Sequence, residues 1–116
     1  MKSYTDIEQS KKLAEILPIE SADMFYKAGN DTQPTFRLHS YGHIMSDNDI
    51  PCWSLASLLS VLPAECECMS LEHINYGNNH KKYFMSYVGG EYTDIYDNPI
   101  DACVAMIERL HELKML

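Results

Sequence analysis

The sequence lacks any long hydrophobic run. No stretch of its 116 residues approaches the ~20 apolar residues that a membrane-spanning helix needs. Its polar start, MKSYTDIEQSKK, also lacks the apolar segment of a secretory signal peptide. These two absences predict a cytoplasmic protein without a membrane partner, and the four cysteines are then expected to be reduced thiols.

Basic side chains are scarce. The chain has 17 acidic residues against 9 lysines and arginines, and its net charge is −8 at pH 7. A negative surface repels phosphate groups, so we expect no nucleic-acid partner. The acidic residues are scattered and form no tail. They have two interpretations: a solubility device, which is the simpler one, or an acidic face for a basic partner.

Catalytic motifs are absent as well. The sequence contains no G-x-S-x-G, Walker, G-x-G-x-x-G or H-E-x-x-H pattern. His39 and His43 are four residues apart, but they straddle the end of an expected strand and Gly42, so their rings should not share a face. We assign no catalytic residue and lean against an enzyme. The alternative is a small-molecule-binding or enzymatic domain, with a pocket between helix and sheet lined by His39, His73 and tyrosines.

Three segments carry the signals of helices. The first opens with the capping-box pattern Thr5-x-x-Glu8 and is closed by a proline, and the last opens with Asn98 and Pro99. All three show apolar residues at helical spacing, which predicts helices over residues 5–17, 51–62 and 98–114. The expected core residues of these helices are Trp53, Leu55, Leu59, Val104, Ile107 and Leu110.

Aromatic-rich runs bounded by turn formers separate these helices. MFYK and TFRLHS flank AGNDTQP, which is typical of a β-hairpin. CMSLEHINYG, KKYFMSYVGG and EYTDIYD predict an antiparallel meander of three strands. The resulting order, α-β-β-α-β-β-β-α, predicts one α+β domain over residues 1–116, with three helices packed on an antiparallel sheet.

The stretch LPAECECMS places Cys66 and Cys68 beside two glutamates. In a strand, alternate residues lie about 6.5–7 Å apart, the outer limit for a disulfide. Cys52 and Cys103 supply no second close pair, which a structural zinc site would need. We interpret all four cysteines as packing residues and predict no metal and no cofactor.

Tyrosine is abundant, with eight residues. Alternate residues of a strand share a face, and tyrosine is enriched at protein interfaces. One interpretation is cross-strand aromatic pairing that stabilises the sheet. The other is an interaction surface on the sheet, formed by Tyr83, Met85, Tyr87, Tyr92 and Tyr96.

Three stretches carry a resemblance: SYTDIEQSKKLAEILPIESADM, PCWSLASLLSVLP and NPIDACVAMIERLHELKML. They resemble short uncharacterised proteins encoded by gut Bacteroides-type bacteria, their prophages and mobile elements, and the similarity is weakest over residues 26–47 and 64–97. The resemblance implies a bacterial, intracellular and phage-associated setting and carries over no catalytic residue. The missing catalytic motifs, the net charge of −8 and the candidate tyrosine-rich face of the sheet lead us to expect a small acidic accessory or interaction protein that binds an unknown protein partner or associates with itself.

Overall fold

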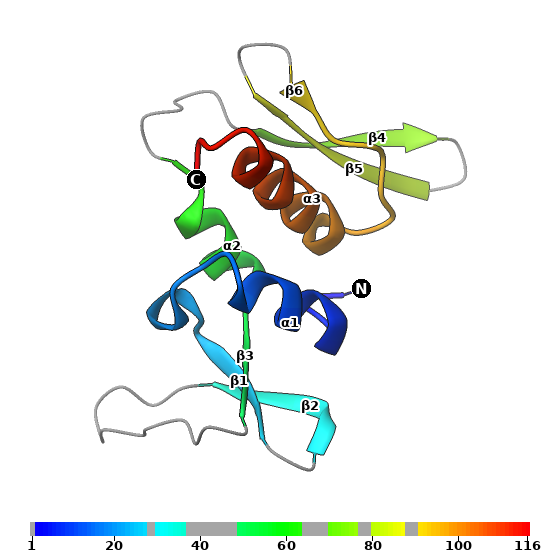
Figure 1. The fold of residues 1–116 in the computed structure, drawn as a ribbon. Helices are drawn as coiled ribbons and strands as arrows, with labels where there is room; N and C mark the ends of the chain where they lie inside the picture. Colours follow the sequence, from blue (N-terminus) through cyan, green and yellow to red (C-terminus); the bar gives the residue numbers. More distant parts are fainter. Residues whose placement is uncertain (1, 28–29, 37–48, 64–69, 77–79, 88–90) are drawn as a thin grey trace.

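A computed structural model describes residues 2–27, 30–36, 49–63, 70–76, 80–87 and 91–116. Within these ranges, three helices lie between two small antiparallel sheets (Figure 1). The helices are α1 (Ile7–Ala14), α2 (Leu55–Val61) and α3 (Pro99–Glu112), with a 3-10 turn, η1 (Ile19–Ser21), after α1. The strands are β1 (Met24–Lys27), β2 (Asn30–Phe36), β3 (Ile50–Cys52), β4 (Ser70–Tyr76), β5 (His80–Tyr87) and β6 (Glu91–Tyr92).

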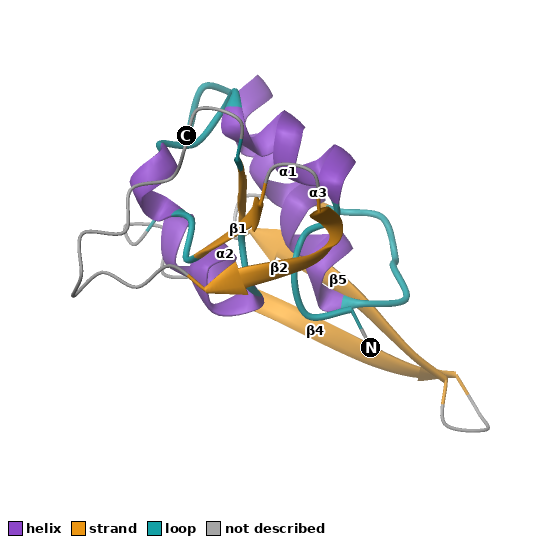
Figure 2. Cartoon of the chain, turned by 90° about the horizontal axis from the view of Figure 1, so that it is seen from below, coloured by secondary structure: helices purple, strands orange, loops and turns teal. Residues whose placement is uncertain are grey.

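The strands are divided between the two sheets in the orders β2-β1-β3 and β4-β5-β6. Helix α1 packs on the first sheet beside β3, and α3 packs on the second sheet along β5. The β4–β5 hairpin extends outward beyond the helices, as Figure 2 shows from below. The α+β class is confirmed, and the predicted helices and strands follow one another in the predicted order. The sequence did not predict the additional strand β3 or the division into two sheets.

Strand β3 replaces the start of the predicted helix 51–62. Pro51 and Cys52 pair with Phe25 and Met24 of β1, and the helix begins only after Ser54. The Ser54 side chain accepts a hydrogen bond from the Ser57 N–H, as an N-cap residue does. Pairing with β1 satisfies the backbone of residues 50–52 and holds them in an extended conformation that apolar spacing along the chain could not reveal.

Helix α1 is also shorter than the predicted 5–17: it ends at Ala14, and it begins only after Asp6 because the capping box uses other residues. The Asp6 carboxylate accepts from the Gln9 N–H at 2.8 Å, and the Gln9 side chain accepts from the Asp6 N–H at 3.1 Å. Thr5 and Glu8 are therefore not the capping pair. The Thr5 hydroxyl instead bonds to Ser10 inside the protein.

Helix α3 ends at Glu112, two residues before its predicted end. Lys114 has a positive φ of 60°, which breaks the helical path. The N–H of Lys114 donates to the His111 carbonyl and the N–H of Met115 to the Leu110 carbonyl, which together form a Schellman motif. The helix thus ends with its last carbonyls bonded, and the half-buried Leu116 packs back against the core.

One hydrophobic core joins the three helices and β5. Its fully buried side chains include Leu13, Trp53, Leu58, Met85, Ile100, Met106, Ile107 and Leu110. Val104 is buried too, and Leu55 is partly buried against this cluster. The prediction for Leu59 is wrong: its side chain is 44% exposed, whereas Leu58 is 0% exposed. Because α2 starts at Leu55, its buried side turns toward Leu58 and Leu62.

Strand β6 is shorter than the predicted run EYTDIYD. Only Glu91 and Tyr92 form the strand, and the Thr93 hydroxyl then accepts from the Met85 N–H at 2.8 Å. The chain pairs with β5 again at Tyr96, which forms an isolated antiparallel bridge with Tyr83. The chain therefore follows β5 to Tyr96, with an irregular stretch where a continuous strand was expected.

Candidate functional site: the groove between α1 and α3

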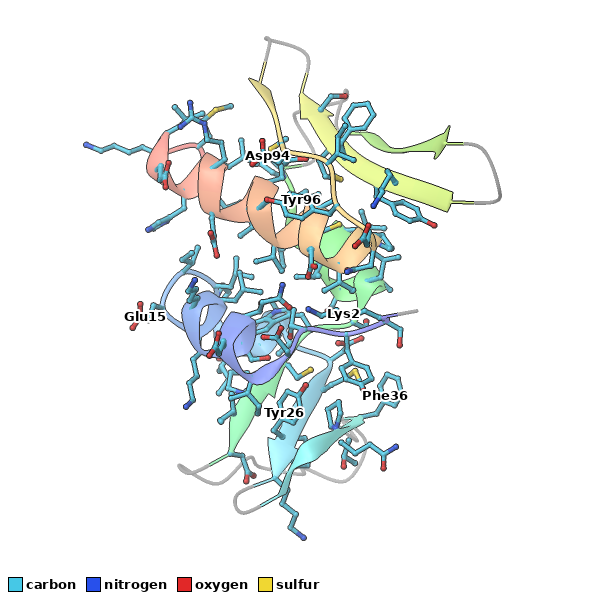
Figure 3. All side chains as sticks on the ribbon, turned by 90° about the vertical axis from the view of Figure 1, so that its right-hand side faces the viewer. Lys2, Glu15, Tyr26, Phe36, Asp94 and Tyr96 are labelled. Atoms are coloured by element: carbon cyan, nitrogen blue, oxygen red, sulfur yellow. The ribbon has the colours of Figure 1, made fainter. Side chains whose placement is uncertain are left out.

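Helices α1 and α3 lie side by side and run in the same direction, and a groove separates their outer surfaces. Two adjoining hollows of about 330 and 390 Å³ occupy it. Lys12 and Glu108 line both hollows, so we treat them as one feature, the α1–α3 groove. Lys2 lies at one end and Glu15 at the other (Figure 3).

The periodicity of each helix places polar residues along this groove. Asp6, Gln9, Lys12 and Glu15 recur every three residues and lie along one wall. The facing wall belongs to α3, and its charged or titratable lining residues are Asp101, Glu108, His111 and Glu112. Tyr96 and the half-buried Ile16 add aromatic and apolar surface.

The groove carries more negative than positive charge. Five carboxylates line it against two lysines. Lys2 is already paired with Asp6 and Asp101. Within the described part of the chain, Glu15, Glu108 and Lys12 form no ion pair. The half of the groove near Glu15 and Glu108 can therefore accept positive charge from outside the chain.

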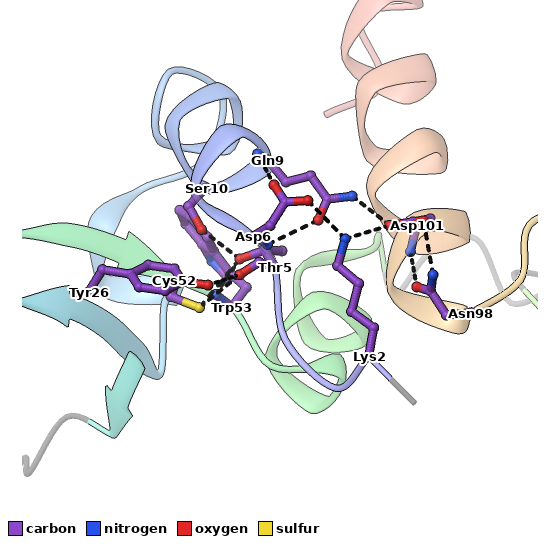
Figure 4. A network of polar contacts seen from close by, with 10 residues as sticks. All are labelled: Lys2, Thr5, Asp6, Gln9, Ser10, Tyr26, Cys52, Trp53, Asn98 and Asp101. Atoms are coloured by element: carbon purple, nitrogen blue, oxygen red, sulfur yellow. Dashed lines mark hydrogen bonds and ion pairs between the residues drawn. The ribbon is translucent and has the colours of Figure 1, made fainter. Parts of the chain in front are cut away.

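The other end of the groove is occupied by a polar network centred on Lys2 (Figure 4). The Lys2 ammonium donates to Asp6 Oδ2 at 3.0 Å and to Asp101 Oδ1 at 2.9 Å. Gln9 Nε2 donates to the same Asp101 oxygen at 2.7 Å, and Asn98 Nδ2 donates to Asp101 Oδ2 at 2.9 Å. The network joins the N-terminal segment, α1 and α3, which are far apart in the sequence.

Helix electrostatics explain this arrangement. Asp6 and Asp101 lie at the beginnings of α1 and α3, where a carboxylate is stabilised by the positive end of the helix dipole. Because the two helix starts lie together, the two carboxylates would repel each other. The ammonium of Lys2 lies between them and offsets that repulsion.

The network shifts the pKa of its members. Partial burial would raise the pKa of the Asp101 carboxyl, but hydrogen bonds from Lys2, Gln9 and Asn98 outweigh burial and lower it. Burial likewise opposes the charged form of Lys2, yet its bonds to Asp101 and Asp6 raise the pKa of the ammonium. Both shifts mean that the charged network stabilises the folded state.

We expect a pH-dependent contribution of this network to stability. A lowered carboxyl pKa contributes stability above its ordinary value of 3.8, and this stability is lost as pH falls through the folded-state value. A raised lysine pKa contributes below 10.5 and is lost as pH rises through the folded-state value. Asp101→Asn should lower the free energy of unfolding by ~1 kcal/mol between these limits, because the groups are partly exposed.

Urea unfolding across the pH range checks this expectation. Asp97→Asn is the matched control, since Asp97 pairs with Lys82 at an exposed site outside the groove. It should change the free energy of unfolding by less than about 0.5 kcal/mol. Equal losses for the two variants, or an Asp101→Asn loss that persists unchanged at pH 2, would contradict the assignment.

A second polar cluster lies inside the protein, where the N-terminal segment meets β3 (Figure 4). The Thr5 hydroxyl lies 2.8 Å from Ser10 Oγ and accepts from the Trp53 N–H at 3.1 Å. The Tyr26 hydroxyl donates to the Thr5 carbonyl at 2.6 Å, and Cys52 Sγ donates to that carbonyl at 3.4 Å. All these groups have partners, so the cluster fastens the N-terminal segment to the core.

Neither of the two cysteines within the described residues is an activated nucleophile. Burial raises the pKa of the Cys52 thiol, although Thr5, Ser10 and Tyr26 partly oppose the shift. Burial raises the pKa of the Cys103 thiol to about 12. Both therefore remain protonated near neutral pH. They belong to different buried clusters, in agreement with their interpretation as packing residues.

The predicted interaction surface is not a single exposed patch. Met85 is only 1% exposed and belongs to the core, because α3 covers its side of β5; its inclusion in the surface is corrected. Tyr83 and Tyr96 are partly buried against the same core. Their backbones exchange hydrogen bonds of 2.7 and 2.8 Å in an isolated bridge, which places the two residues opposite each other, as cross-strand pairing requires.

The remaining predicted residues lie outside what the structure describes. The side chains of Tyr87 and Tyr92 are not among the described ones, and neither is that of His73, although all three backbones lie in strands. His39, His43, Cys66 and Cys68 lie outside the described residues. The described residues contain no group of three potential metal ligands. Because these candidate ligands are not described, the absence of a metal site stays a prediction.

Comparisons with protein-family models, with curated proteins and with solved structures find no match for this chain. Among the helices within the described ranges, none is both long enough and apolar enough to cross a membrane. Sequence reasoning missed the groove. The only available signals were the acidic residues of the two helices, and nothing in their spacing showed that these helices are neighbours.

Proposed function

We propose that this protein is a small acidic accessory or interaction protein without enzymatic activity, and that its α1–α3 groove binds a positively charged segment of a partner protein. The observation that carries the proposal is the pair Glu15 and Glu108. These carboxylates line one groove from its two walls, and neither has an ion-pair partner within the described residues. The bacterial, cytoplasmic and phage-associated setting belongs to the same proposal.

Charge complementarity supports a basic protein partner. The net charge of −8 draws cationic segments toward the whole molecule, and the local excess of carboxylates gives them a place to bind. Ile16 offers an apolar contact for the aliphatic part of a lysine or arginine side chain. The same charge opposes a nucleic-acid partner and association of two copies through this groove.

The alternative, a small-molecule-binding or enzymatic domain, has less support. The described thiols are buried and protonated, and the described hydroxyl cluster around Thr5 is closed to solvent. The α1–α3 groove lies between two helices, whereas the pocket of the alternative, lined by His39 and His73, lies outside the described side chains. An interaction role therefore agrees better with the described side chains.

A binding titration with paired charge variants tests the proposal. The probe is a fluorescein-labelled helical peptide with lysines four residues apart, and the readout is fluorescence anisotropy at low salt. Glu15→Gln with Glu108→Gln should weaken binding by about three- to thirtyfold, since each of the two lost ion pairs contributes roughly 0.3–1 kcal/mol. Binding by the unmodified protein should weaken steeply as salt is raised.

The matched control is Glu8→Gln with Glu20→Gln, which changes the net charge equally but lies outside the groove lining. It should leave affinity within about twofold of the unmodified protein. Equal weakening by both double variants would show non-specific attraction to an acidic molecule. That result, or no binding by the unmodified protein, would refute the proposed function.

A further inference from the structure

The N-terminal end of the α1–α3 groove already holds a positively charged group. Lys2 lines the groove, and its ammonium contacts Asp6 and Asp101, the latter 99 residues away in the sequence. A lysine ammonium bound by two carboxylates is the contact that a basic partner would make. The chain therefore places a side chain of its own where a partner's lysine or arginine would bind.

We propose that Lys2 is an intramolecular competitor for the groove, which a basic partner displaces from the Asp6–Asp101 carboxylate pair. The inference rests on the proposed function and adds a form of regulation to it. While Lys2 is in place, a partner gains only the half of the groove around Glu15 and Glu108. Displacement of Lys2 opens the second half and lengthens the binding surface toward Tyr96.

The backbone around Lys2 is anchored independently of its side chain. The Thr5 N–H donates to the Trp53 carbonyl at 3.0 Å, and the Leu55 N–H donates to the Ser3 carbonyl at 3.4 Å. The Tyr26 hydroxyl bonds to the Thr5 carbonyl inside the protein. Because these bonds do not involve Lys2, its side chain can leave the carboxylates while the N-terminal segment stays in place.

Replacing the Lys2 ammonium by a partner's cation should also cost little free energy. The Lys2 side chain is 26% exposed, so solvent and a partner can reach it from the groove. An incoming ammonium or guanidinium restores the same charge pairing, and Gln9 and Asn98 keep their bonds to Asp101 throughout. Water rehydrates the departing Lys2 ammonium, so breaking its ion pairs costs little free energy.

Lys2→Met tests the inference, because methionine keeps the aliphatic chain and removes the charge. With the same lysine-bearing peptide, this variant should bind about three- to fivefold more tightly than the unmodified protein. Lys2→Arg keeps a cation in place and should bind with nearly unchanged affinity. The control for net charge is Lys11→Met, at an exposed position of α1 outside the groove lining, which should stay within about twofold.

The outcomes separate this inference from the proposed function. If the unmodified protein binds the peptide and Lys2→Met binds it equally or more weakly, Lys2 is a structural brace and the competitor inference is wrong. If Lys11→Met tightens binding as much as Lys2→Met does, the effect is one of net charge, and the inference is again wrong. If no variant binds the peptide, the proposed function itself fails. Thermal melts confirm that each variant is folded.

Discussion

We expect deletion of residues 107–116 to abolish cooperative folding. The deleted segment contains Ile107 and Leu110, both 0% exposed in the core between α3, the other helices and β5. Burial of each contributes ~1.5–3 kcal/mol, a large share of the ~5–15 kcal/mol that stabilises a domain of this size. The remaining eight residues of α3 are too few to form a stable helix without that packing.

Thermal unfolding followed by circular dichroism measures this effect. Deletion of residues 113–116 alone is the matched control. It removes the Schellman motif and the half-buried Leu116 but keeps Ile107 and Leu110. The shorter deletion should lower the melting temperature and preserve a cooperative transition. If the protein with the longer deletion melts cooperatively within a few degrees of the full chain, the end of α3 is a peripheral arm. The assignment of Ile107 and Leu110 to the core would then be wrong.

The second large effect is expected for Trp53→Ala, which should lower the free energy of unfolding by ~3–5 kcal/mol. Trp53 is 0% exposed and packs in the cluster that joins the three helices. Its indole Nε1 donates to Ser21 Oγ at 2.9 Å, so the substitution also removes one of the two partners of that hydroxyl, which keeps its bond to the Pro18 carbonyl. Urea denaturation measures the loss through the midpoint, provided that the slope is unchanged.

Two variants show whether the loss comes from the indole packing. Trp53→Phe keeps an aromatic ring and should lose clearly less stability than alanine does. Leu59→Ala removes a side chain that is 44% exposed and should cost less than about 1 kcal/mol. If Trp53→Ala loses as little stability as Leu59→Ala does, the packing of Trp53 does not stabilise the core as argued.

Local chemistry along the chain determined much of the fold. The Asn98 cap, the proline at position 99 and the apolar stripe that follows define α3, and Ile107 and Leu110 lie in the core as predicted. Tyr83 and Tyr96 lie opposite each other in a backbone bridge, an arrangement compatible with one of the two interpretations of the tyrosines. These features depend on neighbours a few residues away, or on the period of one element, and both can be counted in a sequence.

Contacts between distant segments decided the rest. Thr5 looks like a helix cap in the sequence, but Trp53 and Ser10 bind its hydroxyl, and Asp6 becomes the cap. Residues 50–52 look like the start of a helix, but β1 holds them as a strand. Such competition between local and long-range hydrogen bonds is settled only when the segments meet.

The candidate site belongs to this second group. Glu15 and Glu108 each look like an ordinary solvent-facing acid of an amphipathic helix. They line one groove because the core packs α1 beside α3, and Lys2 bridges Asp6 and Asp101 for the same reason. The sequence by itself determined which helices carry acidic residues. Only the tertiary structure decided that those residues share one groove, because Coulomb interactions depend on distance in space and not on separation along the chain.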